Sequence, residues 1–324
     1  MLHETHHQES QSHWAGPQHQ RPRTGAEILS NLTKWYGEGR PLLTKDALRN
    51  VQKQLRSPLQ GVDKVWTIGF DGAKVEWEAW GKPYGVPEEE EAAYCSMTVS
   101  YLLGLKDMVT KVPVVYPSYT VDESRAVLQQ SIRTWEESET WSHLKKTLIP
   151  ILSRHHVNKI VGFSCFSLSW PQEESEDIRS GIQHALLLTV RSLLERTTAE
   201  HNVPCYVQDP AYNDVDKEVL QEQGMQFVND PQGFLEVDES SVVFSCASNI
   251  AVKEIVTELA RPAVIIWDKV EERKIETGDE LGDDFYPSTD PATPRVFDML
   301  SNSYDTYTFL PDTNFGNMAV YVRK

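Results

Sequence analysis

The chain has 324 residues, and its formal net charge at pH 7 is −17. Hydrophobic residues make up 40% and charged residues 24%, which is ordinary globular usage and supplies enough apolar material for a sizeable core. A surface of this sign repels nucleic acid and anionic membranes and favours cationic partners, although it also serves solubility. No run of about 18 apolar residues occurs, so the sequence predicts no membrane-spanning helix.

The four cysteines form no Cys-x-x-Cys pair, which argues against a zinc ribbon. They are Cys95, Cys165, Cys205 and Cys246. Three of them lie in or beside apolar, strand-like runs, where free cysteine behaves as a small buried hydrophobe. We therefore expect free thiols in a reducing, cytoplasmic compartment, with no bound metal or cofactor.

Residues 1–23 hold five of the ten histidines and almost no apolar residues. We interpret this segment as a disordered tail rather than a signal peptide or a metal site. Residues 24–139 are predicted to form an N-terminal elaboration of helices and a β-hairpin. The first helix begins at Thr24, which has capping-box spacing to Glu27. The hairpin comprises strands over 65–70 and 74–80 around an Asp71-Gly72 turn.

A second helix is predicted over 45–55, and one of its faces is basic. Its cations recur at steps of four, four and three residues and are Lys45, Arg49, Lys53 and Arg56. The face is either a solvated surface or a local phosphate-binding surface. Two further helices are expected near 122–138 and 139–154.

Strands and helices alternate from residue 157 onward, which predicts an α/β domain over residues 140–324. Strands are expected at 159–163, 204–208, 225–228, 241–245, 263–267, 307–310 and 319–322. Helices are expected at 178–196, 214–223, 251–260 and 294–301. Buried apolar strands separated by helices indicate a doubly wound, mostly parallel sheet, in which ligands bind at the carboxyl ends of the strands.

The first strand end carries three hydroxyls, in Gly162-Phe-Ser164-Cys-Phe-Ser167-Leu-Ser169. Ser164 could act as a nucleophile, and the turn could hold a phosphate, a carboxylate or an acyl oxyanion. The alternative is a tight turn with serines as caps, because no general base is fixed beside it. His155, His156 and His184 are candidates that spacing does not place.

The second strand ends at Asp209, whose position at a strand end and before Pro210 makes it the best candidate for a ligand-contacting carboxylate. Asp214 and Asp216 open the next helix, where capping explains them well. Ser245 and Asn249 mark the end of another strand, and Cys246 between them is interpreted as a packing residue.

Residues 140–323 resemble the SRR1-like family. The resemblance is carried by Ile160-Val-Gly-Phe-Ser164, Ile182-Gln-His-Ala185, Gln208-Asp-Pro-Ala-Tyr212, Ser241-Val-Val-Phe-Ser245 and Ala251-Val-Lys-Glu-Ile255. The Asp-Pro-Ala-Tyr form is similar to that of fungal members. The resemblance implies a Rossmann-like fold and a regulatory or binding role, since the better-known members have clock-linked and haem-linked roles and no agreed reaction.

The segment from Gly162 to Trp170 also resembles the signature of cyclodipeptide synthases, which join two aminoacyl groups taken from charged tRNAs. That resemblance implies an aminoacyl transferase making an arginine-containing diketopiperazine in fungal secondary metabolism, with arginyl-tRNA as a partner. The catalytic residues would be Ser164, Ser167, Asp209 and Glu218. The substrate would contact Tyr212, Asp214, Asp216, Ser245 and Asn249. The tRNA would lie on Lys45, Arg49, Lys53 and Arg56. A non-catalytic regulatory protein that binds a protein partner remains the alternative.

Overall fold

The computed structural model describes residues 25–56, 64–68, 74–78, 118–171, 178–197, 202–271 and 289–324. These residues belong to two compact units. One unit is drawn from residues 1–42 and 58–100, and the other from residues 43–57 and 101–324. The predicted tail over 1–23 and the Asp71-Gly72 turn lie outside the described residues.

The smaller unit contains helix α1 (Gly25–Gly37) and strands β1 (Lys64–Ile68) and β2 (Lys74–Glu78). The two strands pair antiparallel, with Val65 opposite Trp77. This pairing is the one expected for a hairpin, so the predicted pair of strands is confirmed.

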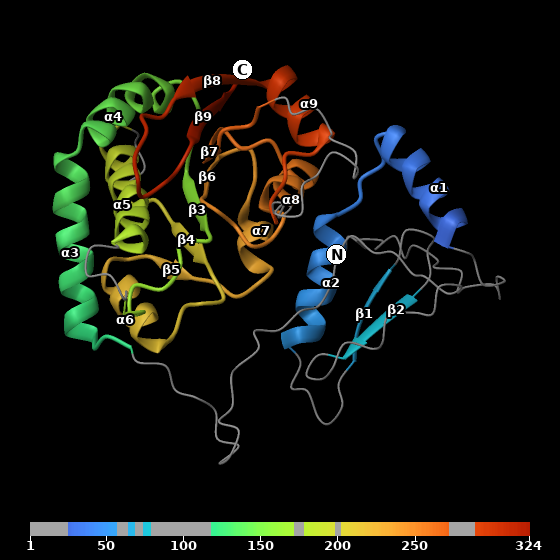
Figure 1. Ribbon diagram of the computed structural model, residues 1–324, viewed down its shortest axis with the longest axis horizontal. Coiled ribbons are helices and arrows are strands. Elements are labelled where there is room, and N and C mark those ends of the chain that lie inside the picture. Colours follow the sequence, from blue (N-terminus) through green and yellow to red (C-terminus); the bar gives the residue numbers. More distant parts are fainter. Residues whose placement is uncertain are drawn as a thin grey trace, which may run out of the picture. The chain divides into compact units, whose positions relative to one another are not determined.

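The larger unit is built on a seven-stranded sheet with the order β5-β4-β3-β6-β7-β9-β8 (Figure 1). Its strands are β3 (Lys159–Phe163), β4 (Cys205–Gln208), β5 (Gln226–Phe227), β6 (Ser241–Ser245), β7 (Val264–Asp268), β8 (Tyr304–Thr308) and β9 (Met318–Arg323). The strands β5, β4, β3, β6 and β7 run parallel to one another, whereas β9 is antiparallel to both of its neighbours, β7 and β8. The predicted Rossmann-like, mostly parallel α/β fold is confirmed.

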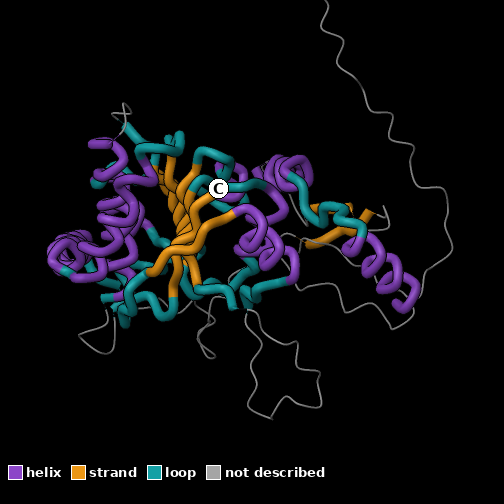
Figure 2. The backbone as a smooth tube through the Cα atoms, turned by 90° about the horizontal axis from the view of Figure 1, so that it is seen from above, coloured by secondary structure: helices purple, strands orange, loops and turns teal. Residues whose placement is uncertain are grey.

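Helices cover both faces of this sheet. The described helices of the larger unit are α2 (Lys45–Arg56), α3 (Val121–Glu137), α4 (Glu139–Leu152), α5 (Arg179–Thr197), α6 (Asp214–Glu222), α7 (Gln232–Glu236), α8 (Val252–Leu259) and α9 (Pro294–Ser303). Helices α3 to α6 lie on one side of the sheet and α7 to α9 on the other, so the strands form the middle layer (Figures 1 and 2). Helix α2 packs on α7.

Helix α5 is the most completely buried helix in the described part of the larger unit. It contacts β3 and β4 on one side and α3 and α4 on the other, so apolar residues such as Leu186 and Leu187 occur on all its faces. The crossing with α3 is close, because a Cβ atom at Gly181 would lie 2.1 Å from the Ser131 hydroxyl. A glycine is therefore required at this contact.

Side-chain caps set the limits of several helices. Thr120 forms a capping box with Glu123 at the start of α3, and Asn213 forms one with Asp216 at the start of α6. Ser138 ends α3 and also caps α4, through a bond from the Trp141 amide. These local signals explain why the helix limits predicted from the sequence agree within a few residues.

Two predictions of secondary structure differ from the structure. The strand predicted at 307–310 is β8, which begins three residues earlier. Its apolar residue Phe309 leaves the strand and packs against Phe315, with ring centroids 5.2 Å apart. Helix α7 was missed because five residues are too few to show helical periodicity. None of the described helices is long and apolar enough to cross a membrane.

Candidate functional site

The carboxyl ends of the central strands are in register. Phe163, the last residue of β3, lies opposite Gln208 of β4 on one side and Ser245 of β6 on the other. The strand order reverses between β3 and β6, which makes this edge the switch point where ligands bind in open α/β sheets. The loops after these strands therefore form the candidate site.

Three residues of these loops adopt left-handed backbone conformations. In the loop after β3, φ is 58° at Ser164 and 61° at Phe166, and in the loop after β6 it is 48° at Ala247. Positive φ is uncommon for residues other than glycine and persists only where the surroundings hold it. Such residues cluster at functional sites, so their position at the switch point supports the choice of this edge.

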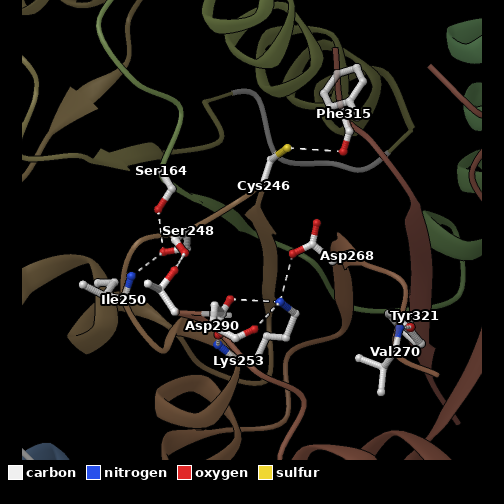
Figure 3. Close-up of polar contacts among 11 residues, drawn as sticks. Ser164, Cys246, Ser248, Ile250, Lys253, Asp268, Val270, Asp290, Phe315 and Tyr321 are labelled. Atoms are coloured by element: carbon white, nitrogen blue, oxygen red, sulfur yellow. Dashed lines mark hydrogen bonds and ion pairs between the residues drawn. The ribbon is translucent and has the colours of Figure 1, made fainter. Parts of the chain in front are cut away.

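A hydroxyl pair joins the two loops. The Ser164 hydroxyl donates to the Ser248 hydroxyl over 2.9 Å, and the Ile250 amide donates to the same Ser248 oxygen over 3.2 Å (Figure 3). The Ser248 carbonyl accepts a further bond, at 2.6 Å, from Thr289. Ser164 is thus placed at the site as predicted, but its partner is another hydroxyl rather than a base.

Asp209 lies at the same edge, and its carboxylate holds the loop after β3. One oxygen accepts a bond from the Phe166 amide at 2.8 Å and the other from the Ala211 amide at 2.9 Å. Burial raises the pKa of Asp209, and the two amide donors oppose that rise. The predicted ligand carboxylate therefore has bonds inside the protein on both oxygens.

Asp216 is fully buried and accepts four hydrogen bonds. One oxygen accepts from the Leu168 and Ser169 amides at 2.8 and 2.9 Å. The other oxygen accepts from the Ser167 hydroxyl at 2.8 Å and from the backbone N–H of Asn213 at 2.9 Å. Ser167 itself is buried, so the structure places both residues in the support of the loop.

Tyr212 and His184 form a second buried contact behind the site. His184 Nδ1 lies 2.7 Å from the Ser180 carbonyl, which can only accept, so Nδ1 carries the proton. In a neutral ring Nε2 then accepts from the Tyr212 hydroxyl, 2.8 Å away. Burial lowers the pKa of His184 to about 4, in agreement with a neutral imidazole.

The remaining predicted residues, the catalytic candidate Glu218 and the substrate candidates Asp214, Asn249 and Ser245, are not brought together. Asp214 and Glu218 are exposed on α6, and Asn249 is exposed in the loop after β6. Ser245 is buried, and its hydroxyl has no hydrogen-bond partner among the described residues.

The predicted basic face on α2 is not a uniform solvated surface. Lys45 is partly buried and donates to the Val237 carbonyl, and burial lowers the pKa of its ammonium. Arg49 forms an ion pair with Asp46 at 2.8 Å. Lys53 is exposed, and the side chain of Arg56 lies outside what the structure describes.

Sequence reasoning missed a buried lysine between two carboxylates. Lys253 on α8 lies 2.9 Å from Asp268, at the end of β7, and 3.0 Å from Asp290 (Figure 3). Lys253 and Asp290 are buried, whereas the Asp268 side chain is 40% exposed. The available signal was that Lys253 stands three and four residues before the buried Val256 and Thr257, on one helix face.

The ammonium of Lys253 forms ion pairs with both of these carboxylates. No group of three or more histidine, cysteine, aspartate or glutamate residues suited to a metal occurs in the described ranges. Cys165, Cys205 and Cys246 are free and buried, and burial raises the pKa of each thiol.

The family model of the SRR1 domain matches residues 144–322. The match runs from α4 to the last strand, includes every loop of the candidate site, and covers more than half of the chain. No curated protein matches this sequence.

We expect Asp216→Asn to destabilise the larger unit by about 2–4 kcal/mol, because an amide nitrogen cannot accept bonds from the buried donors and leaves them unsatisfied. The matched control is Asp214→Asn, two residues away, where the side chain is fully exposed. Denaturant unfolding measures both. Equal unfolding midpoints for the two variants would contradict the role assigned to Asp216.

We expect His184 to make the fold less stable as the pH falls from 6.5 towards 4. In that interval the unfolded chain binds a proton that the folded chain does not, because the folded pKa is about 4. The slope reaches roughly 1 kcal/mol per pH unit. The variant His184→Gln has no imidazole to titrate at this position, so its stability lacks this dependence on pH. The difference in unfolding free energy between wild type and variant should therefore shrink as the pH falls. A difference that stays constant over the interval would show that His184 does not titrate in this way.

Proposed function

The chain belongs to the SRR1 domain family, and from that premise we propose that it is a non-catalytic regulatory protein that binds a small ligand at the switch-point edge. The observation that carries the proposal is the hydrogen bond between Ser164 and Ser248. It joins two loops that contain residues with positive φ, at the edge where α/β sheets bind ligands. Strained loops held in one conformation are preorganised for binding.

The polar groups beside Ser164 are better placed for support than for catalysis. A nucleophilic serine needs a base within hydrogen-bond reach that can take its proton. The hydroxyl of Ser248 cannot serve, and His184 is directed to Tyr212 and Ser180 instead. Asp209 is bonded to two backbone amides.

The same edge offers contacts for a ligand with an apolar ring and hydrogen-bond donors. Phe166 and Trp170 are 42% and 39% exposed, and their ring centroids lie 6.0 Å apart. Exposed aromatic side chains of this kind mark binding surfaces. Asp268 adds a partly exposed carboxylate at the end of β7, two strands from β3 on the same edge, which favours an amine, a guanidinium or a hydroxyl on the ligand.

The test is a thermal-shift screen of aromatic amines, guanidinium compounds and aromatic alcohols on the whole chain. We expect a stabilising compound whose affinity falls about fivefold to tenfold in Ser248→Ala, the worth of one lost hydrogen bond. Ser142→Ala, on the exposed part of α4, is the matched control and should leave binding unchanged. Equal effects of the two serine changes, or no stabilising compound, would count against the proposal.

Cyclodipeptide synthesis is the second candidate function. The observation that favours it is the positive φ of Ser164 directly after a strand, since a strained strand-to-helix turn is one way in which enzymes present a nucleophilic serine. Under this candidate Ser164 would accept an aminoacyl group from arginyl-tRNA. The attached amine would then attack a second aminoacyl ester, and cyclisation would release the diketopiperazine and regenerate the serine.

Mass spectrometry of bacteria expressing the chain separates the two candidates. We expect no new mass equal to two amino acids minus two waters, because the Ser164 hydroxyl has no base within reach among the described residues. Such a mass, present with the wild type and absent with Ser164→Ala, would overturn the non-catalytic proposal and establish acyl transfer.

A further inference from the structure

A groove of about 570 Å³ lies between α4 and the outer strands of the sheet. One wall is a single face of α4, because its residues His143, Lys146 and Pro150 recur at steps of three and four. The other wall comes from β8, where Asp305 and Tyr307 are two residues apart and project from the same face of the strand. Arg154 and Arg323 complete the lining at the loop after α4 and the end of β9.

This groove is at the amino edge of the parallel strands, away from the switch point. Val264, the first residue of β7, pairs with Val322, and Tyr304 of β8 pairs with Arg323. The loop after α4 leads into the first residue of β3. Ser164 follows the opposite end of β3, so the groove and the switch-point site are separate.

The lining is strongly cationic for a chain of net charge −17. Lys146, Arg154, Arg323 and Lys324 face one lining carboxylate, that of Asp305. Lys146 and Arg154 are exposed, and their side chains make no ion pair or hydrogen bond within the described residues. Within the described ranges, Arg323 donates to the Arg261 carbonyl and Lys324 to the carbonyls of Ser301 and Asn302, which are neutral acceptors.

Two histidines, His143 and His155, also line the groove. The Nδ1 atom of His143 is buried and has no hydrogen-bond partner among the described residues. Burial lowers the pKa of His155, and the charges of Arg323 and Arg154 lower it further.

We propose that this groove binds a phosphorylated small molecule with a flat ring, of the nucleotide type. The phosphates would lie against Lys146 and Arg154, since guanidinium and ammonium groups are the usual partners of phosphate. The ring would stack on Tyr307, which is 39% exposed, and Asp305 would accept a bond from an exocyclic amine. The volume falls within the roughly 300–1,000 Å³ of typical small-molecule sites.

The test is calorimetric titration of the whole chain, at about 0.15 M ionic strength where exposed charges outside the groove are largely screened, with ADP, inorganic phosphate and adenosine in turn. We expect one ADP per chain, weaker binding of phosphate, and no measurable binding of adenosine. Lys146→Glu or Arg154→Glu should weaken ADP binding about tenfold or more, because each change replaces a cation that would bind the phosphates by a carboxylate that repels them. Tyr307→Ala should weaken the binding of ADP but not that of phosphate.

The matched control is Lys145→Glu, which makes the same charge change at an exposed residue of α4 outside the groove. It should leave ADP affinity within about twofold of wild type, the difference expected from net charge alone. The proposal is overturned if ADP does not bind, if Lys145→Glu weakens binding as much as Lys146→Glu, or if phosphate binds as tightly as ADP. Loss of ADP binding in Ser248→Ala would instead place the nucleotide at the switch point.

Discussion

The carboxyl edge of the sheet depends on the buried carboxylate of Asp216. A carboxylate removed from water is costly unless charge-assisted hydrogen bonds compensate it. Here four donors do so, and the positive end of the α6 dipole adds to them. The donors come from the loop after β3 and from the cap of α6. One side chain therefore fixes two segments that are nearly fifty residues apart.

The same loop is tied to a third segment. The Ser169 carbonyl accepts a bond from the Tyr119 amide at 2.7 Å, next to the cap of α3, and the Ser169 hydroxyl accepts one from Asn213. With its later part anchored on three sides, the loop can hold Ser164 and Phe166 at positive φ. The acidic groups at this edge mostly hold other parts of the chain in place. Lys253 between Asp268 and Asp290 repeats the pattern at β7.

The sequence predicted the strands of the sheet from their periodicity. It also predicted, from the rule for strand ends, the edge of the sheet on which Ser164 and Asp209 both lie. It did not distinguish Asp214 from Asp216, which both open α6. Asp216 stands three and four residues before the buried Val219 and Leu220, so helical geometry turns it inward, while Asp214 points to solvent. The same reasoning applies to Lys253. For Lys45 no local pattern would have sufficed, because its partner Val237 lies 192 residues along the chain.

Net charge describes the surface as a whole and says little about one groove. The carboxyl edge gathers carboxylates whose partners are inside the protein. The groove at the amino edge gathers cations, of which Arg323 and Lys324 donate to neutral carbonyls. The two edges are separated by the length of β3, five residues or roughly 17 Å of strand. That distance is about twice the Debye length at physiological salt, so exposed charges at one edge are largely screened from the other. An acidic chain can therefore present a local site for an anion without weakening a site for a hydrogen-bond donor at the opposite end of the same strands.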